Sequence, residues 1–341
     1  MEPLVSVCCA TYNHERYIES ALDGMLRQRA DFPFEILVHD DCSTDGTQAI
    51  LRRYAQRYPG VVLPLLQTEN QYSKGVPINE TFNFPRARGR YIALCEGDDY
   101  WTDENKLSRQ IAYLTAHTDC TFCFTNATIH DTRGERADRP FLPYYPEDAA
   151  SYSDESRSYD LGQIAGLRFL PTASFVFPVS ALKSVPDALW RKECLTGDMR
   201  YKLLLTAAGY AYYQRESTCV YRENVSGSAL QLWGGENRAL NHRRAQKVLD
   251  MLDDVDAFSG GRYREALRPC RDRYARIALL NAPDPRALLD ADNRRVYRAL
   301  PLRERGRFWL KQLVPDSAVQ RVRRLLADGA DKRGAKGSEK S

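Results

Sequence analysis

The chain has 341 residues, with 49 basic against 45 acidic side chains and a formal net charge of +4. This length is enough for one large domain with an appendage or for two domains. The near balance of charge leaves no general footprint for nucleic acid, so we expect no nucleic acid partner. No stretch approaches the ~18 apolar residues of a membrane span, and the first residues lack the basic start and apolar core of a signal peptide. We therefore expect a cytoplasmic protein that does not span a membrane.

The nine cysteines are scattered, and four of them sit inside apolar runs, at Cys8, Cys9, Cys95 and Cys219. Buried free thiols of this kind are typical of a reducing compartment. The close pair in "CTFCFTNAT" (120–128) has no second pair at zinc-site spacing, so we interpret it as part of a strand.

Short apolar runs alternate with amphipathic stretches along the first 130 residues. The amphipathic stretches predict helices over 18–26, after a cap at Asp45, across 78–87 and after a cap at Thr102. This regular alternation predicts an α/β domain with a mostly parallel central sheet. The strands that we expect are 4–10, 34–40, 61–66, 90–96 and 120–129.

Polar clusters follow three of the expected strands, namely "TYNHE" (11–15), "DDCSTD" (40–45) and "EGDDYW" (96–101). The carboxyl ends of parallel strands meet at one edge of a sheet, where ligands collect, so we expect the three clusters to share one site. The third cluster crowds three carboxylates into four positions. This crowding costs free energy unless a cation, a proton or several hydrogen-bond donors neutralise the charge. An exposed acidic turn is the alternative interpretation.

The chain beyond residue 136 changes character twice. Residues 137–172 contain prolines, tyrosines and mixed charges without a clear period, which indicates either a functional loop or a mobile insertion. Beyond about residue 229 the patterns are helical and rich in Arg, Leu and Ala. We therefore expect a first domain over 1–228, a helical C-terminal extension over 229–328 and a disordered tail over 329–341.

The end of the chain is basic. Residues 301–341 carry 11 Lys plus Arg against 5 Asp plus Glu, a net charge of +6. Such a helix either rests on an anionic membrane surface as a peripheral contact or packs against the first domain or a second subunit. Its apolar face, surrounded by arginines, consists of Ala318, Val319, Val322, Leu325 and Leu326.

The motifs together resemble those of the family 2 glycosyltransferases with the A-type nucleotide-sugar fold. The resemblance rests on their order and spacing and covers roughly residues 4–228. It implies a Rossmann-like sheet that binds a nucleotide-diphosphate sugar and passes the sugar to an acceptor hydroxyl, usually with inversion. The motifs are "VSVCCATYNHERYIESALDGMLRQ", "FEILVHDDCSTDGT", "ARGRYIALCEGDDYW" and "TGDMRYKLLLTAAGY" with "VYRENVSGS".

The resemblance implies a nucleoside pocket lined by Thr11, Tyr12, Asn13 and Glu15, in which Glu15 accepts a hydrogen bond from a ribose hydroxyl. A helix N-cap is an alternative or additional role for Asn13. Asp41 matches the position that accepts the imide N–H of the base, which favours a uracil or thymine nucleotide. Its neighbours Asp40 and Asp45 are expected to shape the turn.

The resemblance also explains the acidic cluster at residues 96–99, because a diphosphate that binds together with Mn²⁺ or Mg²⁺ needs carboxylate oxygens to hold the metal. Asp98 and Asp99 are the expected ligands. Glu96 stands where many relatives carry the first Asp of an Asp-x-Asp signature, so its partner is the metal, the ribose or neither. The metal would act as a Lewis acid for the departing nucleotide diphosphate.

The resemblance places the general base for the acceptor hydroxyl at Asp198, in the first turn of a predicted helix that runs to Gly209. A charge that suits the helix dipole is the alternative. Arg222 is expected to pair with phosphate oxygens of the nucleotide. Many relatives have His where Asn224 stands, so the local contact there is open. In the family, the region that corresponds to residues 137–172 helps to form the acceptor-binding side of the site.

Three functions follow from these residues. The first is a metal-dependent inverting glycosyltransferase that uses a UDP- or dTDP-sugar and a saccharide or lipid-linked saccharide acceptor, in surface polysaccharide or glycolipid assembly. The second is a nucleotide-sugar-binding module without turnover, which the joint presence of three candidate catalytic carboxylates disfavours. The third is a nucleotidyltransferase or phosphohydrolase, although "CATYNHER" lacks the Gly-rich basic loop of a nucleotidyltransferase. A homo-oligomer is compatible with all three.

Overall fold

The computed structural model describes residues 2–193, 197–225 and 238–313. The chain divides into two compact units, of which the first comprises Met1–Gly234 with Asp250–Cys270 and the second Gly235–Leu249 with Arg271–Ser341. The expected domain boundary at residue 228 and the expected tail over 329–341 lie outside the described residues.

The first unit is built on a sheet of ten strands within the described part of the chain, in the order β3-β2-β1-β4-β9-β6-β10-β5, with β7 beside β6 and β8 beside β10. Parallel pairing joins β1 to β2 and β4, β2 to β3, and β6 to β10, whereas β9 runs antiparallel between β4 and β6. β5 and β8 pair antiparallel with β10, and β7 pairs antiparallel with β6, each over two or three residues. The longest pairings are parallel, so the prediction of a mostly parallel central sheet is confirmed. The strands are β1 (Val5–Thr11), β2 (Phe34–Asp40), β3 (Val62–Leu66), β4 (Tyr91–Leu94), β5 (Tyr100–Trp101), β6 (Cys120–Asp131), β7 (Arg139–Pro140), β8 (Arg157–Tyr159), β9 (Val176–Pro178) and β10 (Tyr210–Glu223).

The central strands are buried on both faces, which is why they read as continuous apolar runs rather than alternating ones. Every residue of β4 is buried, and so is every residue of β1 but one. The cysteines at 8, 9, 95, 120, 123 and 219 are buried free thiols, as predicted. Because β1, β2 and β4 run in the same direction, the loops that follow them meet at one edge of the sheet. This confirms the expected convergence of the three polar clusters.

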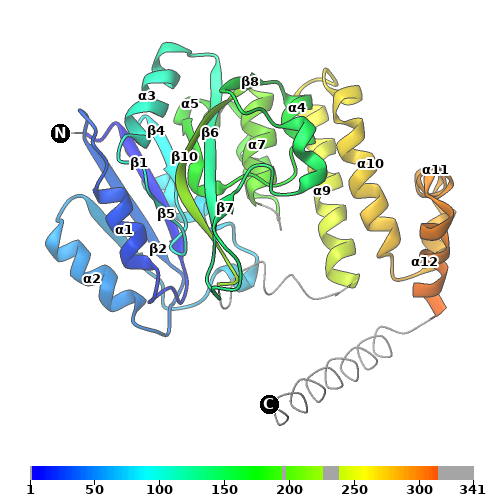
Figure 1. Cartoon of the computed structure of the whole chain (residues 1–341), viewed down its shortest axis with the longest axis horizontal. Helices are drawn as coiled ribbons and strands as arrows, with labels where there is room; N and C mark the ends of the chain where they lie inside the picture. Colours follow the sequence, from blue (N-terminus) through cyan, green and yellow to red (C-terminus); the bar gives the residue numbers. More distant parts are fainter. Residues whose placement is uncertain (1, 194–196, 226–237, 314–341) are drawn as a thin grey trace, which may run out of the picture. The chain divides into compact units, whose positions relative to one another are not determined.

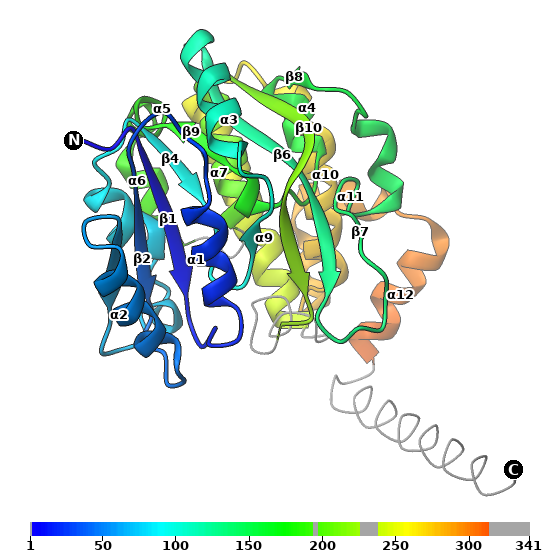
Figure 2. The ribbon, with the colours of Figure 1, turned by 60° about the vertical axis from the view of Figure 1, so that its left-hand side comes forward.

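Helices α1 and α2 lie beside β1 and β2, and α1 passes in front of β1 in the second view (Figures 1 and 2). Helices α9 and α10 each contribute residues to both units. The helices of the described chain are α1 (Ile18–Leu26), α2 (Thr47–Arg57), α3 (Lys106–Ala116), α4 (Leu161–Gly166), α5 (Val179–Ser184), α6 (Asp187–Arg191), α7 (Gly197–Ala207), α9 (Arg238–Phe258), α10 (Arg264–Leu280), α11 (Ala291–Ala299) and α12 (Leu302–Leu313).

Three helix predictions differ from the structure in detail. The cap predicted at Asp45 is wrong, because the N-cap residue of α2 is Gly46. The stretch 78–87 forms a π-helical turn over Asn79–Asn83 and a 3-10 turn over Phe84–Arg86 instead of one α-helix. Its Pro85 has no N–H to donate, so an α-helix cannot continue through it with all its bonds. Thr102 is not the cap of α3, because that helix starts after Asn105, whose side chain makes no capping bond.

Residues 137–172 form short elements that attach to the sheet. β7 pairs with β6, and β8 pairs with β10. A 3-10 helix covers Pro146–Ser151, and α4 begins with a capping box in which Asp160 and Gln163 bond each other's backbone N–H groups. The stretch lacks a sequence period because its elements are only two to six residues long.

The second unit is helical in its described part, in agreement with the expected C-terminal extension. Its core is a cluster of Leu279, Val296, Leu300 and Phe308, drawn from α10, α11, α12 and the residue that follows α11. Among the described residues, no helix has the length and hydropathy needed to cross a bilayer.

The substitution Gly24→Ala should lower the free energy of unfolding by about 1–3 kcal/mol. A Cβ at Gly24 would lie 2.6 Å from the backbone oxygen of Trp101, so α1 can approach β5 only without a side chain there. Urea unfolding of the variant measures this loss. Gly306→Ala in α12 is the matched control, because a Cβ there meets no atom within 4 Å. The control should gain up to about 1 kcal/mol of helix propensity, and an equal effect of both substitutions would contradict the packing argument.

Candidate active site

The loops that follow β1 and β2 are joined by side-chain hydrogen bonds. The backbone of Asn13 is left-handed (φ 55°), and its Oδ1 accepts a hydrogen bond from the Thr44 N–H at 2.8 Å. In return, the Asn13 N–H donates to the Ser43 hydroxyl at 2.9 Å. The His14 N–H donates to the Thr47 hydroxyl at 2.9 Å. Asn13 thus fixes one polar loop against the other.

Glu15 extends the same junction. Its Oε2 accepts from the Gly46 N–H at 2.8 Å, and its own N–H donates to Asp45 at 3.0 Å. The N-cap residue of α1 is Tyr17, so the alternative that Asn13 caps this helix is wrong. Asp45 also accepts from the N–H and hydroxyl of Thr47, the first residue of α2, which confirms that it shapes this helix start.

Asp41 lies buried at the end of β2 and holds a third loop. Its Oδ1 accepts from the Gln71 N–H at 2.8 Å and its Oδ2 from the Tyr72 N–H at 2.9 Å. The Nε2 of His39 lies 3.3 Å from Oδ1, and burial lowers the pKa of this imidazole. Oδ2 keeps a second lone pair, and the expected contact of Asp41 with a base stays a prediction.

The Asp41 junction also positions two exposed tyrosines. Tyr12 follows β1 and is 42% exposed, and Tyr72, whose N–H bonds Asp41, is 50% exposed. Exposed aromatic rings beside a strand end offer flat surfaces for a base or a sugar. Tyr12 is one of the residues predicted from the family resemblance. Tyr72 could not be predicted, because "TENQYSKG" carries only turn signals.

The acidic loop is pressed onto the end of β1. The Gly97 N–H donates to the Ala10 carbonyl at 2.9 Å, and a Cβ at Gly97 would lie 2.5 Å from the Thr11 hydroxyl oxygen. Thr11 itself bonds the ring of His14 at 3.1 Å. The glycine is therefore required here by close approach, and it brings the predicted Thr11 and the carboxylates together.

Asp99 is buried, and its Oδ1 accepts from the Arg222 N–H at 2.9 Å. Burial raises the pKa of Asp99 well above its usual range, and the negative charges of Asp98 and Glu96 raise it further. The carboxylate of Asp98 is partly exposed, and its Oδ2 lies 3.8 Å from Nε2 of His14. Of the two expected metal ligands, Asp98 is thus the more accessible.

Glu96 has a buried Oε2 without a hydrogen-bond partner among the described residues. Burial raises the pKa of Glu96 to about 8, and the charges of Asp98 and Asp198 add to this rise. Asp198 lies about a hundred residues further along the chain, yet it is close enough to act electrostatically on Glu96. The structure therefore places Asp198 within electrostatic range of Glu96.

Asp198 lies in the first turn of α7, as predicted. Burial raises its pKa, while the charge of Lys202 and the backbone N–H groups of Met199 and Leu170 lower it in part. Buried cations fix the helix, because Arg200 bonds Glu80 at 3.2 Å and Lys202 donates to backbone carbonyls before α7.

Arg222 ties the end of β10 to the acidic loop. Its guanidinium donates to the Asp98 carbonyl at 2.6 Å and to the Ser20 hydroxyl at 2.8 Å. Two tyrosine rings flank it, Tyr17 at 5.1 Å and Tyr100 at 4.3 Å from ring centroid to Cζ. Phosphate contact by Arg222 stays a prediction. Its contacts with Ser20 and the two tyrosines could not be predicted from the sequence, because these residues are far from Arg222 along the chain.

The structure shows a partner for Asn224, whose contact could not be predicted from the family resemblance. The residue is left-handed (φ 63°), and its Nδ2 donates to the Asp131 carboxylate at 2.7 Å at the end of β6. Asn224 therefore joins the end of β10 to the end of β6.

Residues 6–172 match the family described as Glycosyl transferase family 2. Through these residues the chain belongs to that family. Its mixed α/β sheet is similar to the structure of Staphylococcus aureus TarS residues 1–349 solved in complex with UDP-GlcNAc. The TM-score is 0.54 at 16% identity, over 90% of this chain and 78% of that one, which confirms the A-type fold.

Curated relatives match shorter stretches of this chain. An uncharacterised protein of Mycobacterium tuberculosis, Rv1520, is 48% identical over 120 residues, which are 35% of this chain and 34% of the relative. The putative teichuronic acid biosynthesis glycosyltransferase TuaG of Bacillus subtilis is 32% identical over 159 residues, 47% of this chain and 56% of TuaG. The chain thus spans between one third and about half the length of these relatives.

The residues at the acidic loop fit a divalent cation that a nucleotide brings with it. The described residues contain no group of three or more His, Cys, Asp and Glu side chains that would hold an ion alone. Mg²⁺ and Mn²⁺ in phosphate sites typically take one or two protein carboxylates, with phosphate and water as the other ligands. The accessible Asp98 and the unpartnered Oε2 of Glu96 are the oxygens available for this purpose.

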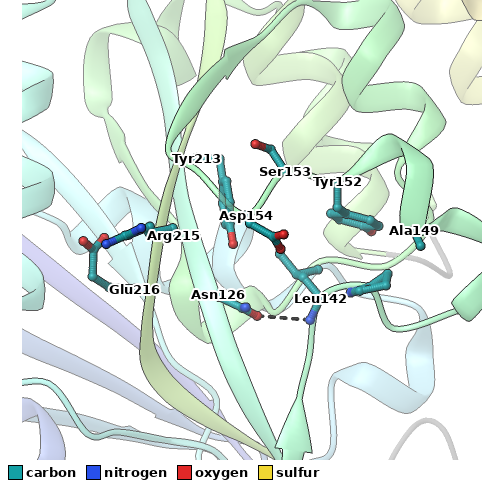
Figure 3. Close-up of a pocket in the computed structure, with 10 residues that line it drawn as sticks. Asn126, Leu142, Ala149, Tyr152, Ser153, Asp154, Tyr213, Arg215 and Glu216 are labelled. Atoms are coloured by element: carbon teal, nitrogen blue, oxygen red, sulfur yellow. Dashed lines mark hydrogen bonds between the residues drawn. The ribbon is translucent and has the colours of Figure 1, made fainter.

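A separate pocket of about 470 Å³ lies beside the middle of β6 and β10. Figure 3 shows Asn126 and Tyr213 on the strand side and Tyr152, Ser153 and Asp154 across from them. Its lining comes from residues 142–154, β6 and β10, and it includes none of the residues predicted to bind the nucleotide or the metal.

Glu96→Gln should make stability less dependent on pH. A carboxyl group whose pKa rises from 4.5 in the unfolded chain to about 8 in the folded one binds more protons when folded, so its contribution to stability is lost as pH rises through 8. In urea unfolding with a chelator, the parent should lose stability relative to the variant between pH 5 and pH 8. Glu265→Gln on the exposed side of α10 is the control, and parallel curves for parent and Glu96→Gln would contradict the assignment.

Proposed function

We propose that this chain transfers a sugar from a nucleotide-diphosphate sugar to an acceptor hydroxyl, with inversion at the anomeric carbon. The observation that carries the proposal is that the negative charge of Asp198, in the first turn of α7, reaches the buried Glu96 of the acidic loop. A donor bound at the acidic loop would then have the Asp198 carboxylate close to the anomeric carbon of its sugar. Family membership supports the same reaction class.

The donor that we propose is a UDP- or dTDP-sugar. Thr11, Tyr12, Asn13, Glu15 and Asp41 line or fix the loops at the edge where the nucleoside would bind. TarS of Staphylococcus aureus, which is named a poly(ribitol-phosphate) beta-N-acetylglucosaminyltransferase and has been solved with UDP-GlcNAc, is 35% identical to this chain over 115 residues. This relative supports a uridine nucleotide, because it was solved with a uridine nucleotide sugar and its matched residues cover 33% of this chain.

A divalent cation, Mn²⁺ or Mg²⁺, would be held by Asp98, with Glu96 beside it. Asp99 was expected as a second ligand, but its Oδ1 already accepts from Arg222, so we propose that it orients the loop. When bound, the cation would screen the negative charge on the departing diphosphate.

Asp198 would act as the general base. The acceptor oxygen forms its bond to the anomeric carbon while the bond to the diphosphate oxygen breaks, and the diphosphate leaves with that electron pair. The proton of the acceptor hydroxyl passes to the carboxylate of Asp198. Burial raises the pKa of Asp198, which makes it a stronger base than an exposed aspartate.

The acceptor that we propose is a saccharide or a lipid-linked saccharide, as expected for polysaccharide or glycolipid assembly in the cell envelope. The name of TuaG, a putative teichuronic acid biosynthesis glycosyltransferase, supports a polymer product. Residues 137–172 would form the acceptor side. A cytoplasmic location, peripheral contact with the inner face of a membrane and a homo-oligomer stay predictions.

Asp198→Asn should lower turnover by at least about a hundredfold, because general-base catalysis contributes about 10²–10⁴ in rate. Donor affinity should change little, since the base acts on the acceptor in the transition state. Release of nucleoside diphosphate and transfer of labelled sugar measure the rate, and calorimetry measures donor affinity. Asp187→Asn, in the first turn of α6, is the matched control. Equal rates for the two variants would remove Asp198 from catalysis, and diphosphate release without transfer would indicate a hydrolase.

Asp98→Asn should abolish the dependence of donor affinity on Mn²⁺ or Mg²⁺. A site with few protein carboxylates loses most of its charge when one of them is neutralised. Calorimetry of UDP binding with and without chelator tests this in parent and variant. Asp138→Asn, an exposed aspartate paired with His130, is the control. If the parent binds UDP equally well with chelator, the metal proposal is wrong.

A further inference from the structure

Helix α12 (Leu302–Leu313) carries an exposed apolar stripe. Leu302 is 81% exposed, Trp309 45% and Leu310 60%. These positions recur at i, i+7 and i+8, and Gly306 fills the intervening turn, so they share one face of the helix. The stripe is opposite to the buried Phe308, which anchors α12 in the core of the second unit. The stripe is therefore exposed even though the opposite face of α12 packs into the core of the second unit.

The stripe is held in place by neighbouring residues. The indole N–H of Trp309 donates to the Tyr297 hydroxyl at 2.9 Å, and the Tyr297 ring also contacts Phe308. Glu304 accepts from the guanidinium of Arg276 at 2.8 Å. These contacts fix the rotation of α12, so the two leucines stay on the outside.

Arginines lie along the stripe. Arg303 and Arg307 are exposed and follow it on one side, and Arg305 lies on the other side, where it bonds the Leu300 carbonyl at 3.0 Å. Residues 291–313 contain seven basic and two acidic side chains, a net charge of +5 that exceeds the +4 of the entire chain. One of the two acids, Glu304, is already paired with Arg276.

We propose that this face of α12, defined by Leu302, Trp309 and Leu310 with Arg303 and Arg307, is a docking surface for an anionic lipid bilayer. An amphipathic helix with leucine and tryptophan on one face and arginine beside them lies in the plane of a membrane interface. Tryptophan prefers the headgroup level, and arginine stems extend along apolar surface while the charge stays in water.

Charge decides between a lipid surface and a second copy of the chain. Two copies that met through this stripe would each bring the exposed Arg303 and Arg307 to the contact, and like charges at close range oppose association. An anionic surface instead attracts each basic residue. Three apolar side chains alone bury too little area for strong binding, so the arginines and the leucines are both required.

This surface does not depend on the proposed transferase activity, because a catalytically inactive chain would bind in the same way. The test is sedimentation of the full chain with vesicles of phosphatidylcholine alone or with added phosphatidylglycerol, at low and high salt. We expect at least about tenfold stronger binding to the anionic vesicles, and loss of this preference at high salt, where surface charges are screened.

Leu302→Ser combined with Leu310→Ser should weaken binding to anionic vesicles at least about tenfold. Arg303→Gln combined with Arg307→Gln should weaken it about 25-fold, from roughly fivefold per charge. Both changes are on the surface, so the melting temperature should stay near the parent's. Leu289→Ser is the matched control, because Leu289 is 74% exposed but lies in the 3-10 helix Pro285–Leu289.

Three outcomes would overturn the proposal: equal binding to neutral and anionic vesicles, parent-like binding by both double variants, or an equal loss in Leu289→Ser. Light scattering adds a further one. If the leucine variant converts a dimer of the chain to a monomer while vesicle binding stays unchanged, the stripe is a contact between copies.

Discussion

The site depends on how the chain neutralises Glu96, Asp98 and Asp99. The Arg222 backbone N–H meets the buried Asp99 carboxylate, and its guanidinium holds the Asp98 carbonyl. This arrangement stabilises one acid of the three and fixes the loop, but it leaves Asp98 partly exposed and one oxygen of Glu96 unpartnered. Excess negative charge therefore remains where a cation and a diphosphate would bind, and Asp198 adds to it.

Strand pairing and side-chain hydrogen bonds both hold this loop in position. The parallel pairing of β1 with β2 and β4 brings the polar loops to one edge, and Asn13, Glu15 and Asp41 then bond these loops to one another. In such a network the same polar side chains are structural and available to a ligand, because their oxygens have unused lone pairs. The second unit contributes a separate surface on α12 that would serve location rather than chemistry.

The sequence predicted the strands, the shared edge and the helix of Asp198, because apolar runs and helical spacing report directly on burial. It could not predict partners distant in the chain. The contacts of Arg222 with Ser20, of Asp41 with the loop at 71–72 and of Asn13 with Thr44 join segments about 30 to 200 residues apart. The wrong cap at Thr102 has a local cause, since several polar residues there are equally suited to start a helix. The nucleotide, metal and base roles came from the family resemblance and remain to be measured.

The most direct test of the central claim is anomalous diffraction at the manganese edge from crystals grown with UDP and Mn²⁺. We predict one manganese peak within bonding distance of the Asp98 carboxylate, with the diphosphate bound to the same ion. The uracil should lie beside Asp41. The carboxylate of Asp198 should face the end of the diphosphate to which the sugar would be attached. A peak and nucleotide bound elsewhere, for example in the pocket beside Asp154 and Tyr213, would contradict the account.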